Sequence, residues 1–420
     1  MSFLALYVGS RVLAAVAAPA AVRRARTIHP SPDAFAPPPH GVAVYLRTDL
    51  DLAIAPLTAG GSLAHSEGII DALMHRGHEV ELWSTGPMAG MPHGIRERRL
   101  PVALRANIPW EIAELLSSLA QVLRARRPAR VCLVYQRYSL NNLTGVWLAR
   151  RWGVPLVLEA NASEVRWREE WSSLQFPRLA RATEAIVLRS SHRIVAVSAN
   201  AAAGLHATGA PEDRIRVVPN GVRVERFAHA APADLPFDED AFVVAFSGLF
   251  YPWHGAQVLG AAFVHLHRAR PNARLLLVGD GEEALLVLGL LDDHDLSAAV
   301  LHTGLVPRDD VAGYLSASDV LVSPHIGNDG FIGSPIKIWE YMASGRAIVA
   351  TRVAQIGAVL EDGVTARLVE PDDPLALAAA LDELCGDPVL RERLGHAAQE
   401  EARLEHSWHA RLAAALDPGD

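Results

Sequence analysis

Buried strands alternating with helices constrain the fold of this 420-residue chain more than any other feature. In the first half, short continuous apolar runs occur at 42–47, 80–83, 131–135, 154–161, 193–198 and 215–220. Such runs lack the alternation of apolar and polar residues that is typical of a sheet with one solvent-exposed face, so both faces of the sheet must be covered. Segments of helical character separate most of them. The pattern predicts an α/β fold with a doubly wound parallel sheet.

The alternation is interrupted once and then starts again. Residues 226–240 are rich in Pro, Asp and Ala, show no period, and are interpreted as an interdomain linker. Further strands are predicted at 242–248, 273–281, 300–304, 319–324, 347–351 and 366–371. We therefore predict two Rossmann-like domains, 41–225 and 241–402, facing a central cleft. Ligands bind such sheets at the carboxyl ends of their strands.

Residues 1–40 form an apolar extension followed by a proline-rich spacer. Arg11 splits the apolar stretch, and the part from Val12 to Val22 is too short to span a bilayer. Its positive charges follow the apolar run, whereas a secretory signal carries them before it. A loosely packed extension, an interfacial helix and a true span all stay open. The charges after the run would keep the remaining chain cytoplasmic.

Composition excludes several classes of function. A net charge of −8 gives no sign of the basic face that general nucleic-acid binding needs. Cys132 and Cys385 have no neighbours at metal-ligand spacing, so we expect no metal site and a reducing, cytoplasmic compartment. Dinucleotide and P-loop fingerprints are absent from the sequence. The D-x-D triplets DLD (49–51) and DED (238–240) do not lie where a metal-dependent single-domain transferase would need them.

Glycine loops follow several of the predicted strands. The loop TAGGS (58–62) opens the first helix, so Gly60 and Gly61 either cradle an anion with their amides or form a simple tight turn. Gly248 and the run VGDG (278–281) end strands in the second half. Each of these loops is a weak signal by itself.

The stretch SPIKIWEYMASG (334–345) begins a helix with a lysine near its N-terminus. A cation there opposes the helix dipole unless an anion is bound. Ser334 is suited to cap this helix, and Pro335 to its first position.

Two interpretations of this helix stay open. Lys337 and Glu340 could form a surface ion pair, since they lie three residues apart on one face. Alternatively the amides of Gly333, Ser334 and Ile336, together with Lys337, bind the phosphates of a nucleoside diphosphate. The Glu340 carboxylate would then accept hydrogen bonds from the ribose hydroxyls.

The order of these segments resembles glycosyltransferase family 4, whose members are retaining enzymes of the GT-B fold. The matching stretches lie within about residues 42–385 and include GGSLAHSEGIIDALMHRGHEV, VVPNGVRVERF, LLLVGDGEE, LHTGLVPRDDVAGYLSASDVLVSP and KIWEYMASGRAIVAT. The resemblance implies a nucleotide-sugar donor in the C-terminal domain and an acceptor in the N-terminal one. It also implies metal-independent transfer without a cofactor, and a C-terminal helix at 403–420 that crosses back to the first domain.

Three residues match family positions. By resemblance, Glu340 is the glutamate that holds the ribose and Gly61 is the glycine near the diphosphate. Val306 lies where backbone atoms of the family meet the base.

Other family positions differ in this chain. Leu249 and His254 replace the usual arginine and lysine after the first strand of the second domain, and Ile332 replaces the first glutamate of the E-x7-E motif. A diphosphate leaving group develops negative charge that positive groups stabilise. We therefore predict that Lys337 substitutes for the missing cations, with help from His254 if a phosphate raises its pKa. Packing beside Trp253 is the alternative for His254.

The acceptor side also departs from the family pattern. Asn161 stands where the family usually has a histidine, and with Glu164 it is a candidate for binding sugar hydroxyls. Arg137 ends a strand and either contacts acceptor or phosphate or forms a structural ion pair. Trp167 and Trp171, one helical turn apart, could stack on sugars, lie at a membrane interface or pack in the core.

The sequence thus predicts a retaining hexosyltransferase that uses a nucleoside-diphosphate sugar. Lys337, Glu340, His254 and Asn161 are the expected catalytic residues. Glycan, lipid-linked and small-molecule acceptors stay open, as does peripheral contact with a membrane. A same-fold epimerase or hydrolase and a non-catalytic nucleotide-sugar-binding subunit are the alternatives.

Overall fold

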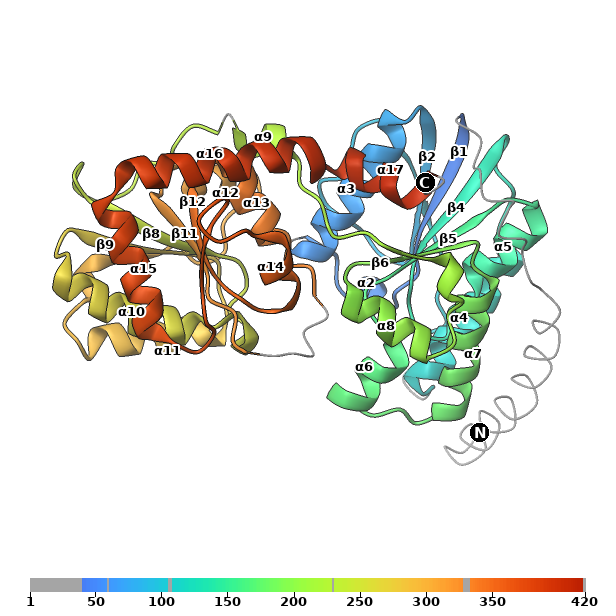
Figure 1. The fold of residues 1–420 in the computed structure, drawn as a ribbon. Coiled ribbons are helices and arrows are strands. Elements are labelled where there is room, and N and C mark those ends of the chain that lie inside the picture. Colours follow the sequence, from blue (N-terminus) through green and yellow to red (C-terminus); the bar gives the residue numbers. More distant parts are fainter. Residues whose placement is uncertain (1–39, 59, 105–107, 229, 328–332, 418–420) are drawn as a thin grey trace. The chain divides into compact units, whose positions relative to one another are not determined.

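The computed structural model describes residues 40–417 except 59, 105–107, 229 and 328–332 (Figure 1). It divides into two compact units. The first holds the described residues up to Pro219 together with those from Arg411 onward. The second runs from Asn220 to Ala410.

The first unit is built on a seven-stranded sheet with the order β3-β2-β1-β4-β5-β6-β7, and all its pairings are parallel. Its strands are β1 (Gly41–Arg47), β2 (His78–Ser84), β3 (Arg96–Arg99), β4 (Val131–Arg137), β5 (Leu156–Ala160), β6 (Arg193–Ala196) and β7 (Ile215–Val217). Its helices include α2 (Asp51–Ile54), α3 (Gly61–His75), α4 (Trp110–Arg124), α5 (Thr144–Trp152), α6 (Glu164–Trp171), α7 (Pro177–Ser190) and α8 (Ala199–Ala207). Every residue of β1 and β5 is buried, as the continuous apolar runs predict.

Strand β3 was not expected from the sequence. Its residues, RERR, are all charged, and three of the four are exposed. It can be a strand because it lies at the edge of the sheet, paired only with β2, where charged side chains keep it in water.

The second unit has a six-stranded parallel sheet in the order β10-β9-β8-β11-β12-β13. Its strands are β8 (Phe242–Ser247), β9 (Ala273–Val278), β10 (Val300–His302), β11 (Val320–Ser323), β12 (Ala347–Thr351) and β13 (Arg367–Val369). Its helices are α9 (Val224–Ala228), α10 (Ala256–Ala269), α11 (Glu282–Asp292), α12 (Val311–Ser316), α13 (Ile336–Ser344), α14 (Ala354–Val359), α15 (Pro374–Gly386), α16 (Pro388–Glu405) and the start of α17 (Trp408–Leu416).

Both faces of this second sheet are buried. Val244 and Phe246 of β8 pack into a core with α10, α11 and α15, whereas Val243 and Ala245 pack into another with α9, α12, α13 and α16 (Figure 1). Alternate residues of one strand therefore enter opposite cores. The prediction of two doubly wound α/β domains is confirmed.

The division between the units falls at Pro219, before the linker predicted at 226–240. Part of that segment is helical, because α9 runs from Val224 to Ala228, and Phe227 packs into the core of the second unit. At the other end of the chain, α16 extends to Glu405, beyond the predicted start of the last helix at 403. The residues from Arg411 onward pack in the first unit, where Arg193 donates to the Ala415 carbonyl over 3.4 Å.

Among the described residues, no helix is both long and apolar enough to cross a bilayer. The expectations for the extension at 1–40 concern residues that, up to residue 39, lie outside the described part of the chain.

Candidate functional site

Lys337 lies in the first turn of α13 and points into the protein. Its side chain is buried, 8% exposed, and Nζ lies 4.0 Å from the centroid of the Phe246 ring. Within the described part of the chain, Nζ has no hydrogen-bond partner. Burial lowers its pKa to about 7, although the Glu340 carboxylate acts in the opposite direction. The surface ion pair that the sequence left open is therefore wrong, and Lys337 is a buried amine without a hydrogen-bond partner among the described residues.

Gly248 keeps the space around this amine open. It follows β8 with a φ of +133°, which L side chains rarely adopt. A Cβ at this position would lie 3.1 Å from Nζ of Lys337. Any side chain here would therefore push the lysine away from the end of β8.

Glu340 lies one turn further along α13 and is half-buried. Burial raises the pKa of its carboxyl group, while the cations Arg308, Arg226 and Lys337 counteract that shift. Arg226 also pairs with Asp309, which follows Arg308 in the chain. The second unit thus places the Glu340 carboxyl group among Lys337, Arg226 and Arg308 beside the start of α13, with Asp309 paired to Arg226.

The segment before α13 is fixed by a residue that the sequence analysis missed. Asn220 donates its backbone N–H to Ser334 Oγ over 3.0 Å and its side-chain Nδ2 to the Ser334 carbonyl over 2.6 Å. Ser334 therefore does not cap the helix as expected: the cap position belongs to Pro335, which has no side-chain donor or acceptor to offer, and Ile336 is the first helical residue. The signal available was the PNG run at 219–221, within a stretch matching the family.

His254 lies close to Lys337 but carries no charge at neutral pH. Burial and the neighbouring Lys337 lower its pKa to about 3, and its Nδ1 contacts the Leu249 carbonyl oxygen. Its ring lies 5.0 Å from that of His325, a buried residue not singled out from sequence, whose pKa burial also lowers. Ile332 lies outside the described residues.

Val306 follows β10 and is half-buried against the core of the second unit. Gly333 is the first residue described after the gap at 328–332 and leads directly into Ser334. Leu249 is 38% exposed and contributes no charge.

In the first unit, the loop before α3 lies beside a buried arginine. Gly60 is the N-cap residue of α3, with a φ of +89°, and Gly61 begins the helix. Arg47, the last residue of β1, donates to Ser62 Oγ over 3.2 Å and to Ser66 Oγ over 2.5 Å. The helix start and the guanidinium group form one polar cluster, in which Arg47 was not predicted from sequence.

Arg137 forms the structural ion pair that was one of its two interpretations. Its guanidinium donates to Glu159 over 2.7 Å, and Glu159 is fully buried in β5. His65 Nε2 lies 2.5 Å from the same carboxylate, and the Tyr135 hydroxyl donates to it over 3.1 Å. Burial opposes ionisation of Glu159, but His65, Arg137 and Arg47 outweigh it and lower the pKa to about 2.

Asn161 and Glu164 lie just after β5, one strand away from Arg137 at the end of β4. Asn161 is exposed. Burial raises the pKa of the Glu164 carboxyl to about 7, against the influence of Arg168. Trp167 is 44% exposed, which rules out core packing for it.

Two family models match most of the chain. The model described as "Glycosyl transferase 4-like domain" matches residues 60–221, and "Glycosyl transferases group 1" matches residues 241–387. The chain belongs to the family 4 glycosyltransferases. The predictions of family and of enzymatic activity, as a hexosyltransferase, are confirmed.

Relatives of this glycosyltransferase cover nearly its whole length. A D-inositol 3-phosphate glycosyltransferase of Pseudarthrobacter chlorophenolicus is 26% identical over 85% of this chain and 89% of its own. The enzyme of the same name from Saccharomonospora viridis is 27% identical over 86% of this chain and 88% of its own.

Solved structures show the same fold at low identity. Sucrose-phosphate synthase from Thermosynechococcus elongatus superposes with a TM-score of 0.67 at 20% identity, covering 88% of this glycosyltransferase and 96% of its own chain. HepE of Anabaena, solved with UDP and glucose, gives a TM-score of 0.63 at 16% identity, covering 89% and 98%.

Proposed function

We propose that this glycosyltransferase moves a sugar from a nucleoside-diphosphate sugar to an acceptor hydroxyl with retention of configuration, in glycan, polysaccharide or glycolipid synthesis. The observation that carries the proposal is the Lys337 amine, buried and without a hydrogen-bond partner among the described residues. An unpaired buried amine is costly for a protein to keep. An anionic ligand that arrives at this position removes that cost.

The donor's diphosphate would bind at the start of α13. The amides of Gly333, Ser334 and Ile336 lie at or just before the helix N-terminus, where backbone N–H groups attract anions. Gly248, which has no side chain, leaves space for the Lys337 amine at the end of β8. Lys337 supplies the positive charge that Leu249 and the neutral His254 do not supply. Charge developing on the leaving group is stabilised by these fixed donors without an added metal or cofactor.

The nucleoside would be held by the next turn of the same helix. We propose that Glu340 accepts hydrogen bonds from the ribose hydroxyls, with Val306 beside the base. The cations Arg308 and Arg226 oppose the rise that burial causes in the pKa of this carboxyl group, and so favour the ionised form that accepts two hydrogen bonds. The HepE structure with UDP makes uracil the first base to test.

The acceptor would bind at the carboxyl edge of the first sheet, with Asn161 and Glu164 as contacts. Asn161 cannot act as a base, so the acceptor hydroxyl would attack from the leaving group's face and pass its proton to a diphosphate oxygen. The names of the relatives make phosphorylated cyclic polyols a sensible first class of acceptor. Two free cysteines among the described residues fit a cytoplasmic enzyme.

Thermal melting with UDP, GDP, ADP and TDP tests the donor proposal, because a ligand that binds the folded state raises the melting temperature. We expect one diphosphate to stabilise strongly and its nucleoside weakly. Turnover with the matching sugar nucleotide, followed by NMR of the anomeric centre, then tests retention. Free sugar formed without acceptor would instead indicate a hydrolase, and binding without turnover over a broad acceptor screen would indicate a non-catalytic subunit.

A further inference from the structure

Arginines concentrate at one edge of the sheet of the first unit. The segments RERR (96–99) and RARRPAR (124–130) hold seven arginines and one glutamate, in a chain whose net charge is −8. The first segment is the edge strand β3, and the second begins at the last residue of α4.

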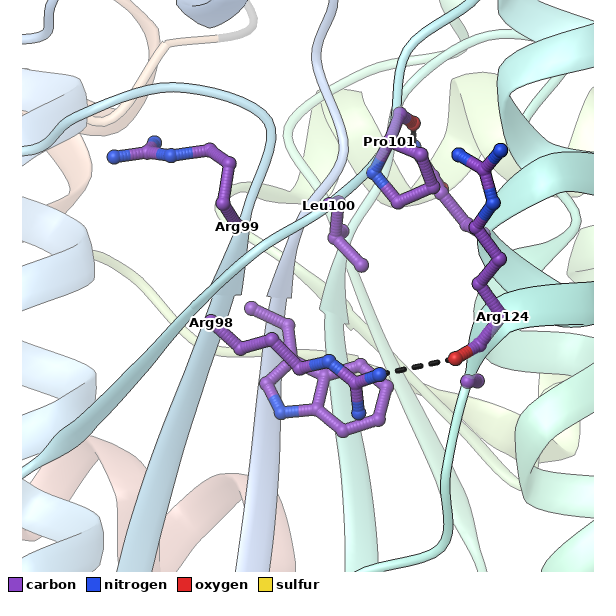
Figure 2. Close-up of a pocket in the computed structure, with 8 residues that line it drawn as sticks. Arg98, Arg99, Leu100, Pro101 and Arg124 are labelled. Atoms are coloured by element: carbon purple, nitrogen blue, oxygen red, sulfur yellow. Dashed lines mark hydrogen bonds between the residues drawn. The ribbon is translucent and has the colours of Figure 1, made fainter.

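The two segments meet around a hollow of about 300 Å³, lined by Trp83, Arg98, Arg99, Leu100, Pro101, Gln121, Arg124 and Ala125. The Arg98 guanidinium lies 4.4 Å from the centroid of the Trp83 ring and donates to the Arg124 carbonyl over 3.0 Å (Figure 2). Stacking and this hydrogen bond hold Arg98 in place before any ligand arrives. Figure 2 shows the Arg124 side chain standing beside Pro101, while Arg99 extends away from the hollow.

Most of these charges have no acidic partner in the described structure. Arg130 pairs with Glu79 over 2.6 Å, and Arg96 lies 4.0 Å from Glu81. No ion pair with a described carboxylate is found for Arg98, Arg99, Arg124, Arg126 and Arg127. Unneutralised arginines at this density repel one another unless an anionic partner covers them.

Exposed apolar side chains lie beside the arginines. Leu119 is 56% exposed and Leu123 is 73% exposed, one turn apart on the outer face of α4. Val102, just after the lining residue Pro101, is 38% exposed. We call the five unpaired arginines together with Leu119 and Leu123 the arginine face.

We propose that the arginine face docks on a membrane surface rich in anionic phospholipids. The guanidinium groups would pair with phosphate head groups, with Arg98 and Arg124 bordering a hollow that a head group can enter. Leu119 and Leu123 would enter the boundary between head groups and acyl chains, as apolar residues of interfacial helices do. The leucines argue against a nucleic acid, which offers them no apolar surface, and the like charges argue against a second copy of this chain.

The test is co-sedimentation of the full chain with vesicles of phosphatidylcholine, alone or containing a third of phosphatidylglycerol, at low and high salt. We expect binding only to the anionic vesicles at low salt. The triple variant Arg124→Ala, Arg126→Ala, Arg127→Ala should lower the partition coefficient by at least about tenfold. Leu119→Ser with Leu123→Ser should also weaken binding, by severalfold, without changing its dependence on salt.

A matched control removes three exposed arginines of the second unit, Arg268→Ala, Arg393→Ala and Arg403→Ala, and should bind as the wild type does. An equal loss in both triple variants would mean that net charge alone matters and would overturn the proposal. So would binding indifferent to phosphatidylglycerol, a dimer in sedimentation velocity that the leucine variant abolishes, or tighter binding to an RNA oligonucleotide than to vesicles. Nucleotide-induced melting shifts should be the same in all variants, which separates this proposal from the proposed function.

Discussion

The amine of Lys337 lies 4.0 Å from the centroid of the Phe246 ring, enclosed by protein and without a hydrogen-bond partner among the described residues. The ring face attracts the ammonium form and partly offsets its loss of water. Because no described carboxylate is hydrogen-bonded to the Lys337 amine, the amine can bind a phosphate without first breaking such a bond. This relationship connects the strand β8 to the proposed chemistry at the start of α13.

Replacing Lys337 by Met should separate binding from stability. We expect Lys337→Met to weaken a nucleoside diphosphate by about a hundredfold, as the loss of a charge-assisted contact would, and to leave the nucleoside unchanged. The unliganded protein should gain about 1–2 kcal/mol, because a buried unpaired amine disappears. Isothermal titration and urea unfolding measure the two effects. Equal weakening of nucleoside and diphosphate would remove the phosphate role.

Binding of a diphosphate should take up a proton above neutral pH. Folding lowers the pKa of Lys337 from 10.5 to about 7, so this group costs stability progressively as the pH falls from 10.5 towards 7. A bound diphosphate favours the ammonium form of Lys337, so at pH 8 the mostly neutral amine should take up a proton when the diphosphate binds. Titration at that pH in buffers of different ionisation enthalpy should show an uptake approaching one proton, absent in Lys337→Met. No difference between the two proteins would contradict the prediction.

Glu340 should discriminate ribose hydroxyls and nothing else. Glu340→Gln keeps the shape but loses the charged acceptor, so diphosphate and nucleoside should weaken together by about ten- to a hundredfold. The preference for ribose over 2′,3′-dideoxyribose should shrink by a similar factor. Competition binding with the dideoxy nucleotide measures this. A variant that keeps the full preference would place the ribose elsewhere.

Asn220 should position the segment before α13 without touching substrate. Asn220→Ala removes the 2.6 Å bond to the Ser334 carbonyl, whereas Ser334→Ala removes the 3.0 Å bond from the Asn220 backbone. Each should cost about 1–3 kcal/mol, because a buried polar group loses its partner. If the segment holds the diphosphate, KM for the donor should rise several-fold in both variants while KM for the acceptor stays constant. Loss of stability with an unchanged donor KM would make the contact purely structural.

Glu159 should be the most sensitive carboxylate of the first unit. Glu159→Gln leaves Arg137 without its buried counter-charge and should cost about 3–5 kcal/mol. The wild-type contribution is fully present above pH 4.5 and is lost as the pH falls towards 2, where the folded pKa lies. Urea unfolding at pH 7 and pH 4 checks both statements. Glu79→Gln, which breaks an exposed pair with Arg130, is the control and should change little.

Several features could be read directly from the chain because they depend on local pattern. Continuous apolar runs predicted twelve strands, which the structure shows as β1, β2 and β4–β13. A strand buried on both faces can be apolar at every position, so such a run indicates it. β3 was missed for the converse reason: an edge strand of four charged residues has no apolar signal. Lys337 and Glu340 were found because they share one short helix.

The contacts that complete the candidate site come from residues far apart in the chain. Asn220 and Ser334 are separated by 114 positions, and Tyr135 and Glu159 by 24. Strand order in each sheet decides which loops meet, and that order depends on how whole strands pair. The environment of His254, which lowers its pKa to about 3, likewise depends on burial beside Lys337 and could not be read from FYPWHG.

The sequence by itself determined that this chain forms two parallel, doubly wound sheets and that a helix beginning near Ser334 carries a lysine and a glutamate on one face. Periodicity and hydrophobicity are local properties of the sequence, so they can be recognised without the structure. Only the tertiary structure decided that, within the described residues, the lysine is buried without a hydrogen-bond partner, and that Asn220 holds the segment before it. It also decided that five arginines of β3, of the last residue of α4 and of the segment after it have no ion pair with a described carboxylate. Desolvation and pairing depend on every group packed around a side chain, and those groups are assembled by the fold.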